Sequence, residues 1–187
     1  MLSYKNIVLR PICAEDIDDY IRWITVETEW RNWDAPWREI DPDSFIQKRR
    51  DALNETTNTP TKLEIETNLG EHIGWLNSSC SDDNMRRRTI GIGIPSTSQR
   101  GKGYGKNALV LFMAYLFEQL PEDMLYIHTW PGNFPMIALA VKVGFAEVER
   151  IKDCHMVRGQ KYNALTFSIT KMDFFARHSS VRESAGY

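Results

Sequence analysis

The chain has 187 residues, with 23 Lys and Arg against 25 Asp and Glu, so its formal net charge is −2. This length suits a single domain, and the near-neutral balance argues against a nucleic-acid binder, which is usually basic over a whole face. No apolar run approaches the ~20 residues that span a bilayer, and the first residues lack the apolar stretch of a secretory signal. The three cysteines, Cys13, Cys80 and Cys154, cannot all pair with one another and lack metal-site spacing. We therefore expect a cytoplasmic protein with no metal, no membrane contact and no nucleic-acid partner.

Residue periodicity predicts the elements of the first half of the chain. Ile17, Tyr20 and Ile24 recur at helical spacing, and Asp41 followed by Pro42 is typical of a helix start. From residue 61 the period changes to two, which indicates a hairpin. The expected elements are a strand at 6–10, a helix at about 14–25, a tryptophan-rich loop at 29–37, a helix at 42–53, a polar loop at 54–60, paired strands around 63–65 and 73–75, and a turn at 81–84.

The second half combines strands with two further helices. The expected elements are a strand at 89–94, a helix over about 108–116, a strand at 125–130, a helix capped by Asn133 and ended by Gly144, a strand at 145–153, a turn at 158–160 and a strand at 165–169. This order predicts one α/β (α+β) domain with a mixed, mostly antiparallel sheet. We place the domain at residues 1–175, with a polar surface tail at 176–187.

A glycine-rich segment lies between the strand at 89–94 and the next helix. Gly101, Gly103 and Gly105 remove side chains at alternate positions, where a backbone would approach a ligand. The helix that follows directs its free N–H groups and its positive dipole end into this loop. Such a loop binds an anion, typically a phosphate or pyrophosphate. Its cations are Arg100, Lys102 and Lys106.

Two common phosphate motifs do not match this segment. A P-loop needs four residues where only three separate Gly101 from Gly105, and it needs Ser or Thr after Lys106. The dinucleotide fingerprint needs G-x-G-x-x-G, whereas the spacing here is G-x-G-x-G. The pattern [Gln/Arg]-x-x-Gly-x-[Gly/Ala] does match, through Arg100, Gly103 and Gly105. It resembles the acetyl-CoA pyrophosphate loop of the GCN5-related N-acetyltransferase (GNAT) superfamily.

Two other stretches carry the same resemblance. Asn133, followed eleven residues later by Gly144-Phe145, is similar to the second conserved block of this superfamily. Residues 7–16 resemble the opening of its ribosomal-protein N-terminal acetyltransferase branch. The similarity in element order covers about residues 4–170. It implies the GNAT fold, with about six or seven strands flanked by about four helices, and acetyl-CoA as cofactor.

The resemblance also implies a cofactor site. The backbone of the strand at 92–94 would hold the pantetheine arm and the thioester, and the side chain of Asn133 would contact the pantetheine arm while also capping its helix. The residues expected to contact the cofactor are Ile92, Gly93, Ile94, Arg100, Gly101, Lys102, Gly103, Tyr104, Gly105, Lys106 and Asn133.

The catalytic residues depart from the better-known family pattern. Ala140 stands where many members carry a tyrosine as general acid, and no carboxylate lies near the start of the strand at 89–94. His128 is one substitute, because a neutral imidazole suits proton transfer at pH 7; the alternative is a core-facing histidine. Glu29 is the other, with Asp34 beside it, either as proton relays through water or as solvated loop carboxylates.

The tryptophan-rich loop is the expected acceptor wall. Trp30, Trp33 and Trp37 lie between the first two helices, where the family binds its acceptor, and aromatic faces beside carboxylates suit a cationic amine. The alternative is that these rings pack the helices onto the sheet.

The resemblance therefore implies an N-acetyltransferase that transfers acetyl from acetyl-CoA directly to a primary amine, either a protein N-terminal α-amine or a small-molecule amine. One rival is a catalytically silent GNAT-fold protein that binds an acyl-CoA or a partner, a rival that the departures at Ala140 and at the strand start keep open. Another is an unrelated phosphate binder that shares only the glycine-rich loop. A homodimer is left open.

Overall fold

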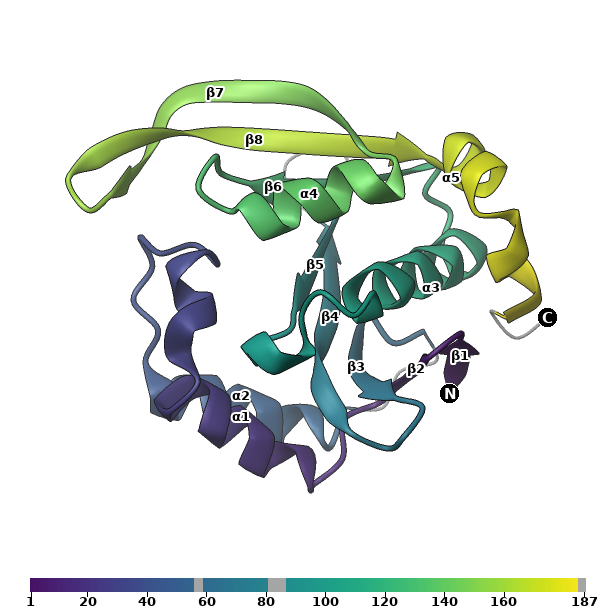
Figure 1. Ribbon diagram of the computed structural model, residues 1–187, viewed down its shortest axis with the longest axis horizontal. Helices are drawn as coiled ribbons and strands as arrows, with labels where there is room; N and C mark the ends of the chain where they lie inside the picture. The colour runs from purple at the N-terminus through teal and green to yellow at the C-terminus, as the bar shows by residue number, and fades with distance from the viewer. Residues whose placement is uncertain (56–58, 81–86, 185–187) are drawn as a thin grey trace.

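The computed structural model describes residues 1–55, 59–80 and 87–184 (Figure 1). The predicted turn at 81–84 and part of the predicted loop at 54–60 lie outside these residues. Within them, eight strands form one sheet: β1 (Leu2–Tyr4), β2 (Ile7–Arg10), β3 (Lys62–Thr67), β4 (His72–Cys80), β5 (Arg88–Gly93), β6 (Met124–Thr129), β7 (Ala146–Val157) and β8 (Gln160–Thr170). The helices are α1 (Asp16–Thr25), η1 (Thr28–Asn32), α2 (Pro42–Ala52), η2 (Thr97–Gln99), α3 (Tyr104–Gln119), α4 (Phe134–Val143), α5 (Lys171–Arg177) and η3 (Ser179–Ser184), where η marks a 3-10 helix.

The sheet has the strand order β1-β2-β3-β4-β5-β6-β8-β7, and every neighbouring pair is antiparallel except β5 and β6. That parallel pair is short: its register joins only Arg88 to Leu125 and Thr89 to Tyr126. Beyond these residues the two strands diverge, as Figure 1 shows for β5 and β6. The strand end at Ile92 and Gly93 therefore pairs with β4 on one side only, which leaves backbone groups for another partner.

Helices cover both faces of the sheet. Successive residues of a strand point to opposite faces, so neighbouring residues of one strand pack in different clusters. In β4, Trp75 packs with α1, η1 and α2, whereas its neighbour Leu76 packs in the larger core beneath α3 and α4. The smaller cluster is aromatic and surrounds Tyr20, Trp23 and Trp30. The predicted mixed, mostly antiparallel α/β sheet is confirmed, with eight strands instead of six or seven in the described part of the chain.

Local capping signals place the start of α2 and both ends of α4 where the sequence predicts them, whereas α3 is longer than the predicted 108–116. The Asp41 carboxylate accepts a hydrogen bond from the Ser44 N–H at 2.9 Å, at the start of α2. Asn133 accepts in the same way from the Met136 N–H at 3.1 Å, at the start of α4. Gly144 ends α4 with φ 112°, a left-handed conformation that glycine adopts without a side-chain clash.

The C-terminal region differs from its prediction. The polar surface tail expected from residue 176 is wrong for Val181, which is fully buried in the core, and α5 and β1 were not predicted. Phe174 in α5 is also fully buried and packs against Phe117 of α3. The boundary at residue 175 stays a prediction. In the described ranges, no helix combines the length and apolar character that crossing a membrane requires.

Candidate active site

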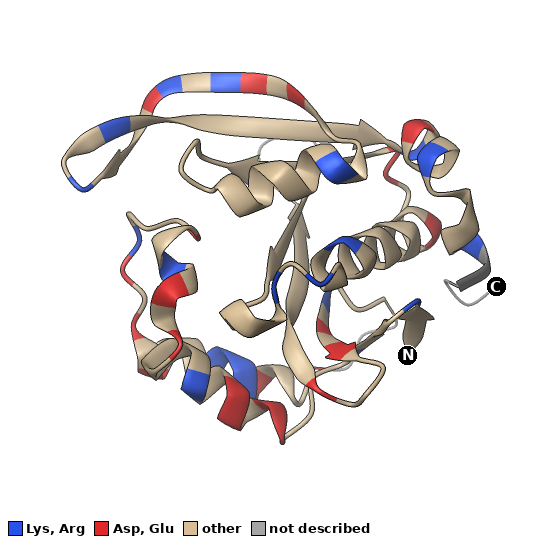
Figure 2. Cartoon of the chain, in the orientation of Figure 1, with Lys and Arg blue, Asp and Glu red and all other residues tan. Residues whose placement is uncertain are grey.

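The glycine-rich loop opens toward solvent at the N-terminus of α3. Gly101 and Gly103 have φ of 77° and 86°, in the left-handed region that side chains rarely adopt. A Cβ at either position would meet no atom within 4 Å, so the loop leaves open space above its backbone. Gly103 is the N-cap of α3, and no side chain caps the helix there. The first N–H groups of α3 therefore face this space with the positive end of the helix dipole. Figure 2 shows Lys and Arg along the same loop.

This loop forms one wall of a cleft of about 460 Å³, which reaches the diverging end of β5. Glycine at position 93 also has a packing reason, since a Cβ there would lie 2.5 Å from the Trp75 ring. The opposite wall comes from α4, beginning at Asn133, and from the loop between α1 and α2. The predicted residues that line the cleft are Trp30, Trp33, Ile92, Gly93, Ile94, Arg100, Gly101, Gly103, Gly105, Lys106 and Asn133.

Arg100 is already engaged by the protein on every side. Its Nε donates to the Ile94 carbonyl at 2.9 Å and its Nη2 to the Pro95 carbonyl at 2.6 Å. Its Nη1 pairs with the Glu29 carboxylate at 2.7 Å, and the guanidinium lies over the Trp33 ring at 5.0 Å. The residue predicted as a phosphate cation therefore ties the glycine-rich loop to the end of β5 and to η1.

The two predicted catalytic residues do not line the cleft. Glu29 is held by Arg100, as described above. His128 is exposed, because its neighbours Ile127 and Thr129 take the buried face of β6, and its Nδ1 lies 3.1 Å from the Thr166 hydroxyl. The core-facing alternative for this histidine is therefore wrong. Both catalytic roles stay predictions without a position in the cleft.

The three predicted tryptophans separate in the structure. Trp30 is buried in the aromatic cluster and also lines the cleft, so it packs the helices and borders the site at once. Trp33 lines the cleft and its carbonyl accepts a hydrogen bond from Trp130 at 2.8 Å. Trp37 instead stacks on the ring of His155, with centroids 3.6 Å apart.

Two residues of the predicted cofactor set also lie outside the cleft lining. The Lys102 ammonium donates to the Gln99 side-chain carbonyl at 3.2 Å and lies 6.0 Å from the centroid of the Tyr104 ring. Tyr104 packs against the large core instead. Ala140, the position of the frequent family tyrosine, is fully buried in that core.

Asp34 is the carboxylate that the cleft does contain. It keeps solvent access, because it lies in a concave wall that water reaches, yet surrounding protein crowds it. This desolvation raises the pKa of Asp34, and the charge of Arg38 offsets part of the rise. A carboxylate with a raised pKa is a better proton acceptor. Its position in the tryptophan-rich loop was visible in the sequence, but its separation from Glu29 was not.

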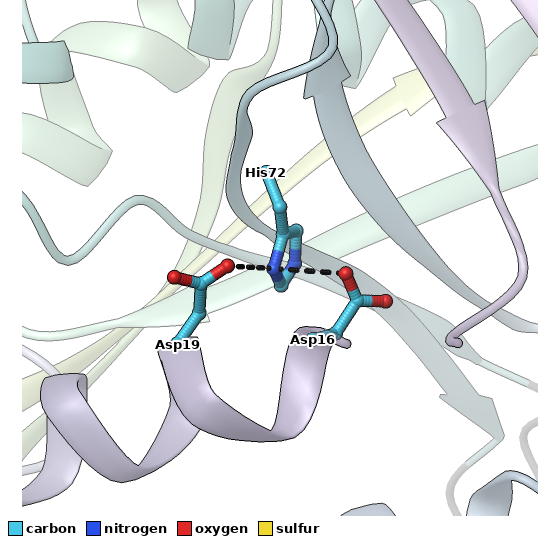
Figure 3. A group of neighbouring side chains, drawn as sticks. All are labelled: Asp16, Asp19 and His72. Carbon is cyan, nitrogen blue, oxygen red and sulfur yellow. Dashed lines mark hydrogen bonds and ion pairs between the residues drawn. The ribbon is translucent and has the colours of Figure 1, made fainter. Parts of the chain in front are cut away.

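A second group of titratable side chains lies under α1, away from the cleft (Figure 3). His72 is buried, with Nδ1 2.9 Å from Asp19 and 3.2 Å from Asp16, and Nε2 3.0 Å from Glu64. Arg10 donates two hydrogen bonds of 2.7 Å to Asp16. Asp16, Asp19 and His72 are close enough to share a cation, but Arg10 already pairs with Asp16 and Arg22 with Asp19, each at 2.7 Å. We interpret the group as a salt-bridge network that fixes α1 on the sheet.

The network predicts a pH-dependent stability. Burial lowers the pKa of His72, but the hydrogen bond to Glu64 and the charges of Asp16 and Glu64 outweigh it and raise the pKa overall. The proton on His72 therefore stabilises the fold fully below the unfolded-state pKa of about 6.5, and this stability is lost as pH rises through the folded-state pKa.

Relative to a His72→Gln variant, the wild-type protein is expected to lose free energy of unfolding above about pH 6.5, by at most about 1.4 kcal/mol per pH unit. Urea unfolding at a series of pH values measures the difference. Subtracting the variant removes the opposite contribution of His155, whose pKa is lowered by burial and by Arg38. A difference that does not change with pH would contradict the role of His72.

Comparison with known proteins identifies the family. Residues 6–146 match the family model described as "Acetyltransferase (GNAT) domain". The chain is 25% identical over 176 residues to the SPbeta prophage-derived uncharacterized N-acetyltransferase YokL of Bacillus subtilis (strain 168), which covers 93% of this chain and 95% of that protein. The fold of this chain is similar to that of spermidine N-acetyltransferase from Vibrio cholerae in complex with CoA and spermine. The TM-score is 0.73 and the identity 16%, over 91% of this chain and 98% of the other. The fold is also similar to that of Mycobacterium smegmatis RimJ in complex with CoA-disulfide, with TM-score 0.71 and 20% identity over 92% and 89% of the two chains. Because the family model spans most of its length, this chain belongs to the GNAT acetyltransferase family.

Proposed function

We propose that this protein is an N-acetyltransferase that uses acetyl-CoA and acetylates a primary amine, either a protein N-terminal α-amine or a small-molecule amine. The observation that carries the proposal is the single cleft of about 460 Å³ in which the glycine-rich loop, the open end of β5 and Asp34 meet. The same space therefore contains a loop suited to an anionic cofactor and a carboxylate that can accept a proton. The narrower assignment to the ribosomal-protein N-terminal acetyltransferase branch rests on residues 7–16 and stays a proposal.

The residues present fit coenzyme A. The open backbone of Gly101 and Gly103, the free N–H groups of α3 and the ammonium of Lys106 would hold its phosphates. The unpaired edge of β5 at Ile92 and Gly93 would hold the amide groups of its pantetheine arm, with Asn133 on the other side. When bound, acetyl-CoA would supply a thioester: its acyl carbon would bond to the amine nitrogen as the carbon–sulfur bond breaks, and the proton that the nitrogen gives up would balance the one that the departing thiolate gains.

We propose that Asp34 is the general base that accepts a proton from the acceptor amine. An amine must be neutral to attack, and a protein α-amine has a pKa of about 8, so a nearby base raises its reactive fraction. Asp34 lines the cleft, and desolvation by the protein that crowds it raises its pKa, which makes it a stronger base than an ordinary aspartate. Trp30 and Trp33 line the same cleft and would flank the acceptor amine. Glu29 and His128, the residues predicted first, have no such position.

An Asp34→Asn variant is expected to lower kcat for amine-dependent thiol release by about 100-fold, the usual contribution of a general base. Its CoA affinity, measured by isothermal titration calorimetry, is expected to remain, because the phosphate end of the cleft is untouched. Glu39→Gln is the matched control, since Glu39 is an exposed carboxylate of the same loop outside the cleft lining. Equal effects of the two variants would contradict the assignment of Asp34.

The same measurements separate the rivals. Tight CoA binding with no thiol release across peptides, polyamines and small amines would favour the catalytically silent acyl-CoA-binding or partner-binding protein. Absent CoA binding, or tighter binding of ATP than of CoA, would favour the unrelated phosphate binder. The cytoplasmic location and a homodimer stay predictions.

A further inference from the structure

A second cavity, of about 400 Å³, meets the active-site cleft at Asp34, the residue that lines both. It lies between the loop that joins η1 to α2 and the tip of the β7–β8 hairpin. These segments are far apart in the sequence, yet Figure 1 shows them at the same end of the molecule, with the hairpin tip above the loop. The cavity therefore adjoins the cleft at Asp34, where the acceptor is proposed to bind.

The charge around this cavity is positive. Three arginines, Arg31, Arg38 and Arg158, line it together with one carboxylate, Asp34. Among the residues that the structure describes, no carboxylate lies within 4.0 Å of any of these three guanidinium groups. Figure 2 shows Lys and Arg both on the loop and at the hairpin tip. Three guanidinium groups around a hollow that contains one carboxylate, with no ion pair closer than 4.0 Å in the described part of the chain, favour an anionic ligand.

Protein contacts hold the arginine of the hairpin tip in place. Arg158 has φ 48°, a left-handed conformation that is unfavourable for a residue other than glycine. Its Nη2 donates to the Asn32 side-chain carbonyl at 2.7 Å, across 126 residues of sequence. The nearby Trp130 Nε1–H donates to the Trp33 carbonyl at 2.8 Å and ties the same loop to the end of β6. The two sides of the cavity are thus joined before a ligand binds.

We propose that the acceptor amine carries a carboxylate or phosphate group, which Arg31, Arg38 and Arg158 bind in the second cavity while the amine reaches Asp34. The inference rests on the acetyltransferase function proposed above and narrows its substrate class. Guanidinium groups bind both anions through paired hydrogen bonds, so carboxylate and phosphate share one recognition chemistry. An anion held in the second cavity points the rest of the molecule toward the junction, which is where the cleft begins.

The same charge disfavours an acceptor that is only cationic. Burial is the main cause of the lowered pKa of His155 and of the raised pKa of Asp34, and the charge of Arg38 adds to the first shift and opposes the second. A polyamine placed here would bring further positive charge beside three arginines with one carboxylate to offset it. Of the two carboxylates that the sequence offered to a cationic amine, Glu29 is paired with Arg100, which leaves Asp34 for that role.

Two sources can supply the proposed chemistry. One is a small molecule of amino-acid size, in which amine and acidic group are a few bonds apart. The other is the N-terminus of a peptide whose first side chains are acidic. The experiment therefore uses matched pairs in both classes: an amino acid against the amine that lacks its carboxylate, 2-aminoethylphosphonate against ethylamine, and peptides that begin with glutamate against the same peptides beginning with glutamine. Spermidine is the cationic comparison.

With acetyl-CoA, thiol release is expected to show kcat/KM at least about tenfold higher for the acidic member of at least one pair, a difference of about 1.4 kcal/mol. In the Arg38→Gln and Arg31→Gln variants, the ratio of kcat/KM for the acidic member to kcat/KM for its uncharged partner is expected to fall toward one. Arg150→Gln is the control, because Arg150 is an exposed arginine on β7 that pairs with Glu147 and lies outside both cavities. Preference for the uncharged members or for spermidine would overturn the inference, as would equal loss in all three variants.

A binding measurement decides the inference even if no amine reacts. Calorimetric titration of the CoA-saturated protein with 2-aminoethylphosphonate, the amino acids and the glutamate peptides is expected to show binding that Arg38→Gln weakens by at least about tenfold. No binding of any of these probes to the wild-type protein would overturn the acidic-acceptor class while leaving acetyl transfer itself untouched. Loss of CoA binding or of all thiol release instead marks failure of the proposed function. The pair that responds identifies the source as small molecule or peptide.

Discussion

A Gly103→Glu variant is expected to lose CoA binding, with affinity reduced by at least about 100-fold. Gly103 lies at the N-terminus of α3 in open space with φ 86°, so the new carboxylate would project where the phosphates are proposed to bind. It would place negative charge beside a negatively charged cofactor and satisfy N–H groups that the cofactor needs. Isothermal titration calorimetry with CoA measures the loss.

The control for this variant is Gly70→Glu. Gly70 has nearly the same conformation, with φ 82° and nothing within 4 Å of its position for Cβ, but it lies in the turn between β3 and β4. Each glutamate is expected to cost about 1–2 kcal/mol of folding free energy, since both force a non-glycine residue into the left-handed region. Only the variant at Gly103 is expected to lose CoA. Equal CoA affinities in the two variants would refute the placement of the phosphates.

Among the substitutions proposed here, Asp16→Ala is expected to cause the largest loss of folding free energy, about 3 kcal/mol. The side chain is 2% exposed, accepts two hydrogen bonds from Arg10 and one from the Cys13 N–H, and faces His72. Its removal leaves the half-buried Arg10 and the buried His72 with fewer counter-ions. We place the loss at the low end of the range for a broken buried pair, because Glu66 still pairs with Arg10.

Thermal unfolding is expected to show this loss as a Tm lower by about 6–12 °C, given the size of the chain. Asp18→Ala is the matched control, because Asp18 is an exposed aspartate on the same helix and its loss is expected to change stability by less than about 0.5 kcal/mol. CoA binding by the folded Asp16→Ala protein is expected to persist, since the network lies outside the cleft lining. A Tm close to that of the control would show that the network contributes little.

Elements with local signals were predictable from the sequence. The start of α2 depends on Asp41 and Pro42, and the end of α4 depends on Gly144, so a few neighbouring residues determine each boundary. In the same way, alternating apolar and polar residues predict β3, and isoleucines at every second position predict β5. Elements that rely on distant partners were missed. The short β1 exists through its pairing with β2, and α5 is stabilised by burial of Phe174 against α3.

The same distinction between neighbouring residues and distant partners applies to the candidate site. The phosphate end was predictable because Gly101, Gly103 and Lys106 are neighbours in the chain, and their spacing carries the chemistry. The acceptor end was not, because it is assembled from segments that only folding brings together. Arg158 lies 126 residues from Asn32, yet a hydrogen bond joins them at the cavity wall. The choice of Asp34 over Glu29 likewise depends on which carboxylate Arg100 neutralises.

The sequence by itself determined the family resemblance, the helix ends and the anion-binding loop, because each depends on residue types at short, fixed spacing. The tertiary structure decided the divergence of β5 from β6, the placement of His128 on the exposed face of β6, and the positive cavity beside Asp34. A formal charge of −2 over the whole chain could not reveal that three arginines converge at one end. Charges act through space, so their effect at a site depends on which side chains the fold places together and which counter-ions it places elsewhere.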